Sequence, residues 1–189
     1  ISLSGLAAAV ANEGGIGVIA SAGIGMVKYG SSESFFEGNI KALREEIRKA
    51  RNLTKGILGV NIMVALTNFA ETVKASIEEG IDIIFSGAGL PLNLPEFLDG
   101  SETTKLVPIV SSARAANLIC QKWWTKYKYL PDAVVVEGPM AGGHLGFKEE
   151  QIGSAEFSLD NIIVDVISTM ERVEDKYGKK IPVVAAGGV

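Results

Sequence analysis

Apolar and polar residues follow two different periods along the chain. Short, continuously apolar runs are typical of strands buried on both faces, whereas apolar residues recurring every three or four positions are typical of amphipathic helices. The runs predict strands at 16–20, 57–64, 81–85, 106–110, 133–136 and 182–186. The helical period predicts helices at 4–11, 39–51, 68–79, 113–127 and 161–177, with a loop or short helix at 91–98.

Some residues indicate where these elements begin and end. Gly14 and Gly15 are expected to stop the first helix, because glycine is the usual residue just after a helix end. Asn68, followed three residues later by Glu71, predicts a pair of reciprocal capping hydrogen bonds at the start of the helix 68–79. The polar stretch 148–159 has no clear period and is expected to be a mobile loop.

Six strands separated by helix-sized connections predict an α/β fold with a parallel sheet, because parallel pairing needs such crossovers. A doubly wound sheet is expected to carry a Gly-x-Gly-x-x-Gly fingerprint after its first strand. The segment 86–89 has only part of that pattern, and it follows the third strand. A (β/α)8 TIM barrel places its chemistry in the loops after the strands. Glycine and polar clusters follow several of the predicted strands, so the barrel is favoured.

The number of strands is smaller than a barrel requires. A complete (β/α)8 barrel has eight strands and usually about 250 residues, whereas this chain has 189 residues and six predicted strands. We therefore expect residues 1–189 to form a single barrel domain that is incomplete at both ends and lacks the first and eighth strands. An open sheet would expose two unpaired edges, so either the chain is a fragment or something else closes the gap.

Composition and charge exclude several function classes. A net charge of -4 gives no basic field for nucleic acid. The apolar beginning has Glu13 at its centre and no basic residue before Lys28, which argues against a signal peptide and a membrane helix. The single cysteine, Cys120, rules out an intrachain disulfide, fits a cytoplasmic protein and is expected to be buried. No cysteine and histidine set has metal-site spacing, so no metal is expected. Trp123 and Trp124 are expected to cover the barrel or form a subunit interface, which leaves a homo-oligomer open.

The most informative segment is 137–147, which directly follows a predicted strand. Gly142 and Gly143 lack side chains, which lets backbone N–H groups approach a flat or anionic ligand. His144 is the only histidine, and its ordinary pKa of about 6.5 suits proton transfer near neutrality. A hydrogen-bonded structural histidine in a glycine turn is the alternative. The position of His144 at a strand end favours a catalytic role.

Two further glycines follow the last predicted strand. Glycines after the seventh strand of a barrel often bind a phosphate through their backbone amides, and Gly187 and Gly188 fit that position. An ordinary strand-to-loop turn explains them equally well. Asn61, near the end of one strand, and Ser111 and Ser112, after another, are expected at the same edge of the sheet.

These segments together resemble the nitronate monooxygenase family, formerly called 2-nitropropane dioxygenases. The resemblance covers nearly the whole chain and rests on 6–20, 59–63, 86–91, 137–147 and 181–189. It implies an FMN-binding barrel in which His144 takes the α-proton from a nitroalkane and the nitronate is oxidised with dioxygen. The cofactor-binding residues that it implies are Asn61 and Glu137 at the flavin ring, Gly142 and Gly143 close to the flavin, and Gly187 and Gly188 at its phosphate.

The chain departs from the family at one implied flavin contact. Family members often carry glutamine where this chain has Glu137, and a carboxylate donates no hydrogen bond unless it is protonated.

Two alternatives remain beside the oxidation of nitronates. The same motifs also resemble the FMN-dependent enoyl-acyl-carrier-protein reductases, which use NADH and an acyl thioester. The run 90–95 favours the nitronate group. A flavin- or phosphate-binding barrel without catalysis is the alternative from another class. The expected partner is a small-molecule substrate, with no nucleic acid and no membrane.

Overall fold

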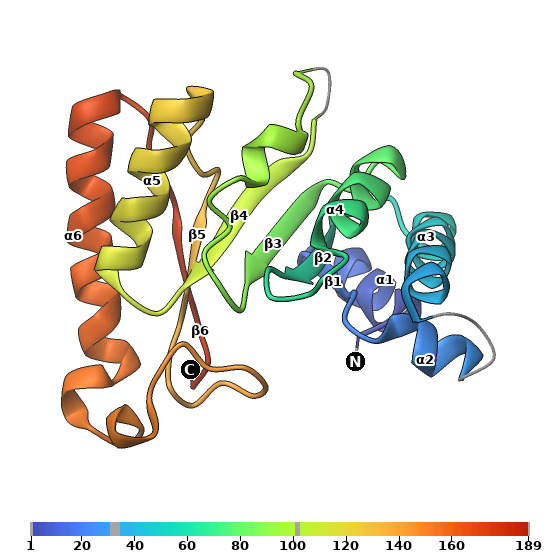
Figure 1. Cartoon of the computed structure of the whole chain (residues 1–189), viewed down its shortest axis with the longest axis horizontal. Helices are drawn as coiled ribbons and strands as arrows, with labels where there is room; N and C mark the ends of the chain where they lie inside the picture. Colours follow the sequence, from blue (N-terminus) through green and yellow to red (C-terminus); the bar gives the residue numbers. More distant parts are fainter. Residues whose placement is uncertain (1, 31–34, 101–102, 189) are drawn as a thin grey trace. The chain divides into compact units, whose positions relative to one another are not determined.

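Helices and strands alternate along the chain, as the hydrophobic pattern predicts (Figure 1). The computed structural model describes residues 2–30, 35–100 and 103–188. The strands are β1 (Gly17–Ala20), β2 (Leu58–Met63), β3 (Ile83–Gly87), β4 (Lys105–Val110), β5 (Val134–Glu137) and β6 (Val183–Ala186). The α-helices are α1 (Ser4–Asn12), α2 (Ile24–Tyr29), α3 (Phe35–Leu53), α4 (Phe69–Glu78), α5 (Ala113–Tyr127) and α6 (Leu159–Tyr177). Three short 3-10 helices are η1 (Leu94–Phe97), η2 (Glu149–Gln151) and η3 (Ala155–Phe157).

The order of the strands distinguishes the two architectures. The strands follow one another in the sheet in chain order, β1 to β6, and the pairs β1–β2, β4–β5 and β5–β6 are parallel. A doubly wound sheet reverses its strand order at a switch point, and no reversal occurs among the described strands. The predicted α/β fold of an incomplete (β/α)8 barrel is therefore confirmed as a topology.

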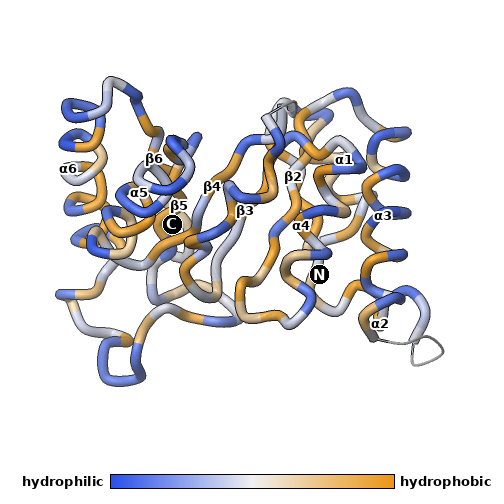
Figure 2. Tube along the Cα trace, turned by 45° about the horizontal axis from the view of Figure 1, so that its top comes forward, coloured by the Kyte–Doolittle hydropathy of each residue, from blue (hydrophilic) through white to orange (hydrophobic). Residues whose placement is uncertain are grey.

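The chain divides into two compact units. The first unit comprises residues 1–85 and 97–105, and the second comprises 86–96 and 106–189. In the first unit α1 lies against β1 so closely that a Cβ at Gly17 would be 1.9 Å from the Ala7 carbonyl oxygen. The apolar face predicted for α3 is largely buried, with Leu43, Ile47 and Ala50 at 1% exposure or less. Figure 2 shows hydrophobic and hydrophilic faces along α3 and α6.

Two local predictions in the first unit need correction. Asn68 precedes α4, but its side chain makes no capping hydrogen bond. Its backbone, at φ -96° and ψ 27°, is outside the extended region that a capping residue normally adopts. Helix α2 was not predicted, because its six residues lie between Gly23 and Gly30 and are too few to show a helical period.

The second unit is built on β4, β5 and β6, with α5 and α6 packed side by side (Figure 1). Trp123 is fully buried and donates from Nε1 to the Pro91 carbonyl oxygen at 2.9 Å. The Trp124 ring lies 4.9 Å from that of Tyr177 on α6. The end of α5 therefore covers its own unit, which is the first of the two roles expected for these tryptophans. Cys120 is buried as predicted, and burial raises the pKa of its thiol to about 12.

Two further segments of the second unit differ from expectation. The stretch expected as a loop at 148–159 contains η2 and η3, and the Lys148 N–H donates to Gln151 Oε1 at 2.8 Å across the first of them. Strand β6 was predicted to be buried on both faces, yet Val184 is 48% exposed. Strand β6 is last in the strand order and pairs with β5 alone among the described strands.

Candidate active site

A cavity of about 260 Å³ lies in the second unit, at the carboxyl ends of β4 and β5. This edge of a parallel sheet is where barrel enzymes place their chemistry. Three polar side chains of the predicted segments reach the cavity, namely Ser111, Glu137 and His144. The other lining residues are apolar or glycine: Ala88, Gly89, Leu90, Ile109, Val110, Ala115, Leu145 and Gly146.

Glu137 is the last residue of β5 and stands at the wall of this cavity. Its side chain is half-buried, and within the described parts of the chain its carboxyl group has no hydrogen bond and no ion pair. Burial disfavours the charged form, and it therefore raises the pKa of Glu137 above its ordinary value. The carboxyl group of Glu137 can therefore contact a molecule that enters the cavity.

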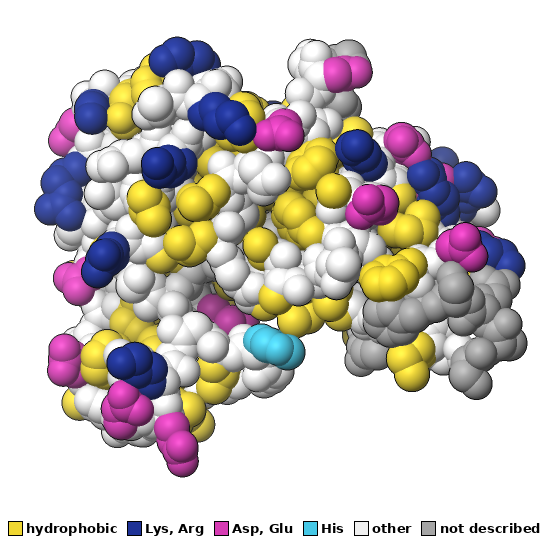
Figure 3. All heavy atoms as spheres, in the orientation of Figure 1, with side chains coloured by type: hydrophobic (Ala, Val, Ile, Leu, Met, Phe, Trp, Pro, Cys, Tyr) yellow, Lys and Arg dark blue, Asp and Glu magenta, His cyan; other side chains and the backbone are white. Residues whose placement is uncertain are grey.

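His144 lies in the loop that leaves β5, seven residues after Glu137. It is exposed, and as the single histidine it is the cyan side chain in Figure 3. Among the described residues, none forms a hydrogen bond with its imidazole. Both ring nitrogens are therefore available to a small molecule in the cavity.

Ser111 holds the loop that carries His144. Its hydroxyl donates to the Gly146 carbonyl oxygen at 3.2 Å, and a Cβ at Gly146 would lie 2.4 Å from that same hydroxyl oxygen. Gly146 is therefore a position where the close approach of a side chain requires glycine. Ser112, the next residue, caps α5 instead. Its hydroxyl oxygen accepts a hydrogen bond from the Ala115 N–H at 3.2 Å.

The two glycine pairs of the sequence lie in different surroundings. A Cβ added at Gly142 or Gly143 would meet nothing within 4 Å. A Cβ added at Gly187 would lie 2.8 Å from the Ala141 Cβ, and one added at Gly188 would lie 2.7 Å from the Met140 Cβ. The first pair therefore borders open space, whereas the second packs against the loop after β5.

The N–H groups of the second pair are nevertheless available. In the described part of the chain, the N–H groups of Gly187 and Gly188 donate no hydrogen bond. Both residues have positive φ angles, 78° and 114°. Unpaired backbone donors after a strand are the kind of group that binds a phosphate. The position of this pair is compatible with both explanations that the sequence left open.

Asn61 belongs to the first unit and is described there. It lies on β2, its side chain is exposed, and its carbonyl oxygen accepts from Ser21 N at 3.1 Å and from Ser21 Oγ at 2.8 Å. The structure thus brings Ser111, Glu137 and His144 to one cavity, and Asn61 is not among its lining residues.

Sequence reasoning missed the walls of the cavity. Leu90, Ile109 and Leu145 line it, and nothing in their hydrophobic pattern distinguishes a cavity wall from a core residue. The run 86–89 at the end of β3 is one signal in the sequence, since Ala88 and Gly89 line the cavity. Ala88 has a positive φ of 50° there, which is uncommon outside glycine.

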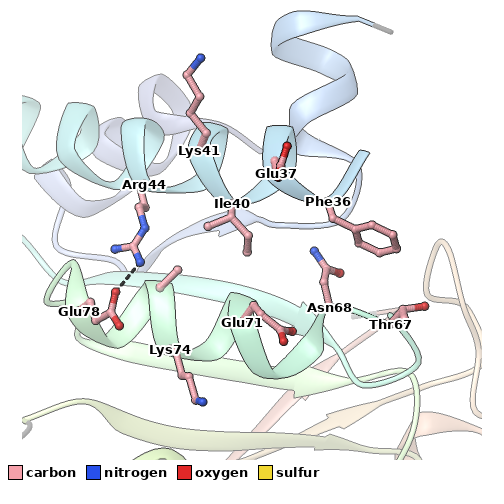
Figure 4. Close-up of a pocket in the computed structure, with 11 residues that line it drawn as sticks. Phe36, Glu37, Ile40, Lys41, Arg44, Thr67, Asn68, Glu71, Lys74 and Glu78 are labelled. Atoms are coloured by element: carbon pink, nitrogen blue, oxygen red, sulfur yellow. Dashed lines mark hydrogen bonds and ion pairs between the residues drawn. The ribbon is translucent and has the colours of Figure 1, made fainter. Parts of the chain in front are cut away.

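A larger cavity lies in the first unit. It is an open groove of about 850 Å³ between α3 and α4 (Figure 4). Arg44 forms an ion pair with Glu78 in this groove, and Phe36 at its rim is 50% exposed. No histidine, cysteine or serine lines this groove. We therefore take the smaller cavity, which His144 and Ser111 line, as the candidate active site.

The described residues contain no group of three or more histidine, cysteine, aspartate or glutamate side chains placed to bind a metal ion. None of the described helices combines the length and apolar character needed to cross a membrane.

Comparison with known proteins places the chain in a family. The sequence profile described as Nitronate monooxygenase matches residues 1–189, whereas no curated protein matches the chain. Among solved structures, FabK from Thermotoga maritima is similar with a TM-score of 0.69 and 27% identity, covering 100% of this chain and 48% of that one. A point mutant of the same FabK gives a TM-score of 0.70 and 28% identity, covering 99% and 50%.

A nitroalkane oxidase from Streptomyces ansochromogenes shares the fold. Its TM-score is 0.70 at 20% identity, covering 100% of this chain and 56% of that one. The chain therefore spans about half the length of the solved structures that it matches.

Proposed function

We propose that this chain, which belongs to the nitronate monooxygenase family, forms part of an FMN-dependent oxidoreductase that oxidises nitroalkanes through their nitronates. The observation that carries the proposal is the shared cavity of Glu137 and His144 at the carboxyl end of β5. The whole-chain family match supports it.

His144 is proposed as the base of the reaction. Its imidazole is exposed and has no hydrogen-bond partner among the described residues, so one ring nitrogen can accept the α-proton of a neutral nitroalkane. The carbon–hydrogen bond breaks, the proton moves to the imidazole, and the electron pair remains on the substrate as the nitronate. FMN, when bound, supplies the electron acceptor, with dioxygen as the final oxidant.

The residues present fit an FMN molecule in two respects. Gly142 and Gly143 border open space, so the backbone there can lie against a flat ring. The N–H groups of Gly187 and Gly188 are available for a phosphate. Glu137, which has no partner among the described residues, would meet the ring or the substrate at the end of β5. Asn61 is proposed as a further contact on the resemblance alone.

Replacing His144 tests the proposed reaction. In His144→Ala we expect kcat/KM for a neutral nitroalkane such as nitroethane to fall by about 10²–10⁴-fold, the usual contribution of a general base. Turnover of the preformed nitronate should stay near the level of the parent protein, because that substrate has already lost its proton. Flavin content is measured by visible absorption on the same samples. Undiminished turnover of nitroethane by a flavin-replete variant would remove His144 from the mechanism.

A second reaction is supported by the comparisons. The two FabK structures are more similar in sequence to this chain, at 28% and 27%, than the nitroalkane oxidase, at 20%. The alternative is NADH-dependent reduction of an enoyl thioester on the same flavin. Anaerobic addition of NADH separates the two reactions, since rapid bleaching of the flavin favours the reductase. Bound flavin without turnover in either assay would indicate a binding module.

A further inference from the structure

A further pocket of the second unit lies apart from the candidate active site. It has a volume of about 240 Å³ and lies between α5 and α6. We call it the α5–α6 pocket, and its lining residues are Asn117, Gln121, Thr169, Arg172, Val173, Lys176 and Tyr177. Ala115 lines the cavity that contains His144, whereas Asn117 lines the α5–α6 pocket. Positions two residues apart point to nearly opposite sides of a helix, so α5 separates the two sites.

The α5–α6 pocket is positively charged. Arg172 and Lys176 line it, and no aspartate or glutamate of the described ranges does. The Arg172 guanidinium donates to the Thr169 hydroxyl oxygen at 2.9 Å, and the Lys176 ammonium lies 5.0 Å from the centre of the Tyr177 ring. Neither cation has an ion pair within those ranges. The charge is not confined to the pocket, because lysine and arginine side chains gather over α5 and α6 (Figure 3), and residues 113–128 include four of them and no acid.

Helix stability alone does not explain the two cations. A positive charge is favourable in the last turn of a helix, and Lys176 lies there, next to the end of α6 at Tyr177. Arg172 lies five residues before that end, which is more than one turn. The two side chains are also four residues apart on one helix, where like charges repel and destabilise it. An anion in the pocket would turn this repulsion into attraction to a shared partner.

We propose that the α5–α6 pocket is a second binding site of this protein, for the phosphate group of a small molecule or a free phosphate ion. Two cations without acids match an anion with two charges, which a phosphate group approaches near neutral pH. A guanidinium donates two parallel hydrogen bonds to phosphate oxygens. The side-chain amides of Asn117 and Gln121 and the Tyr177 hydroxyl provide further donors. The volume of the pocket corresponds to roughly eight water molecules, enough for one phosphate group and part of the molecule that carries it.

Calorimetric titration of the purified protein with inorganic phosphate tests the site, at constant ionic strength and about pH 7.5, where phosphate is mainly a dianion. We expect one phosphate to bind per chain. Arg172→Gln and Lys176→Gln should each weaken binding by about tenfold, as for the loss of one charge-assisted hydrogen bond. Lys122→Gln, the matched control, removes the same charge from an exposed position of α5 outside the pocket and should change the affinity by less than about twofold. Equal weakening by all three substitutions, or no saturable binding to the parent protein, would overturn the proposal.

The stability of the variants distinguishes a binding role from a structural one. Without phosphate, Arg172→Gln and Lys176→Gln should unfold at the same urea concentration as the parent protein or at a higher one, because each removes one member of a like-charge pair. Added phosphate should raise the midpoint of the parent protein more than that of either variant, since a ligand stabilises the folded state that binds it. A midpoint that falls in the variants without phosphate, and responds to phosphate as in the parent protein, would assign the two cations a purely structural role.

Two further ligands identify the class and the source of the anion. Glycerol 3-phosphate is a phosphate ester, whereas succinate carries its charge on two carboxylates. We expect succinate to bind at least about tenfold more weakly than phosphate, and equally tight binding of succinate would contradict the phosphate assignment. Tighter binding of the ester would identify a phosphorylated small molecule as the source, and tighter binding of inorganic phosphate would identify the free ion. Gly187 and Gly188, proposed for the FMN phosphate, do not line this pocket, and no step of the test requires FMN or turnover.

Discussion

Two pairs of glycines follow neighbouring strands, and the structure gives them different reasons for lacking side chains. At Gly142 and Gly143 a Cβ would meet nothing within 4 Å, whereas at Gly187 it would lie 2.9 Å from the Gly138 carbonyl oxygen. The first pair leaves room beside the protein, and the second lets two segments of the protein touch. A glycine pair after a strand is therefore ambiguous in sequence, and only its tertiary surroundings show which purpose it serves.

The largest expected effect is on stability at the packed pair. Gly187→Ala places a Cβ against the backbone at Gly138 and forces a left-handed conformation on alanine at φ 78°. We expect the free energy of unfolding to fall by about 2–5 kcal/mol, as the sum of backbone strain and overpacking. Urea denaturation measures it. A loss smaller than about 0.5 kcal/mol, within the range of ordinary surface substitutions, would show that the loop moves aside freely.

A substitution at the other pair, Gly142 and Gly143, should leave stability nearly unchanged and weaken the binding of FMN. Gly142→Ala adds a methyl group to open space, so the free energy of unfolding should change by no more than about 0.5 kcal/mol. FMN affinity, followed by quenching of flavin fluorescence, should weaken by about tenfold, because the methyl group occupies the space proposed for the ring. Unaltered FMN affinity would mean that Gly142 borders solvent and not the cofactor.

The hydrogen bond between Ser111, just after β4, and Gly146, in the loop after β5, gives a third prediction. Ser111→Ala removes the hydroxyl that donates to the Gly146 carbonyl oxygen. We expect a loss of about 0.5–1.5 kcal/mol in stability and a fall of about threefold in kcat for nitroethane, because His144 is then less well positioned. Ser112→Ala is the neighbouring control. It should lower stability through the lost cap of α5 without changing kcat for nitroethane.

The smallest expected effect is the pH dependence of stability. The pKa of Glu137 is raised by burial, so the folded state retains this proton at a pH where the unfolded state has lost it. Its contribution is fully present below the unfolded pKa of about 4.5 and is lost as the pH rises through the folded value. Glu79 behaves oppositely, because its hydrogen bond with Arg48 lowers its pKa and its contribution is lost as the pH falls.

Urea denaturation between about pH 4 and pH 7 checks this sign. Glu137→Gln should remove the part of the curve in which stability decreases with rising pH. A curve identical to that of the parent protein would show that the Glu137 carboxyl group is solvated in both the folded and the unfolded state.

The fold was largely predictable because the strands are short apolar runs between amphipathic helices. Strand β2, predicted at 57–64, spans Leu58–Met63, and β6, predicted at 182–186, spans Val183–Ala186. The two predictions that failed, at α2 and at the start of α4, concern features that depend on local backbone geometry. Helix α2 is too short to show a period, and Asn68 has the residue type of a cap without the conformation of one.

The candidate site was predictable where chain topology alone brings residues together. Glu137 and His144 follow the same strand, and Ser111 follows the neighbouring strand in a parallel sheet, so all three reach one edge. The hydrogen bond from Ser111 to Gly146 and the crowding at Gly187 depend on distances between segments far apart in sequence. No pattern of residue types along the chain encodes those distances.

The proposed binding of FMN at the carboxyl ends of the strands is tested most directly by a visible absorption spectrum of the purified protein, before and after titration with FMN. We expect the spectrum of a bound flavin at one FMN per chain, with binding weakened in Gly142→Ala. A protein that is colourless and takes up no added FMN would contradict it.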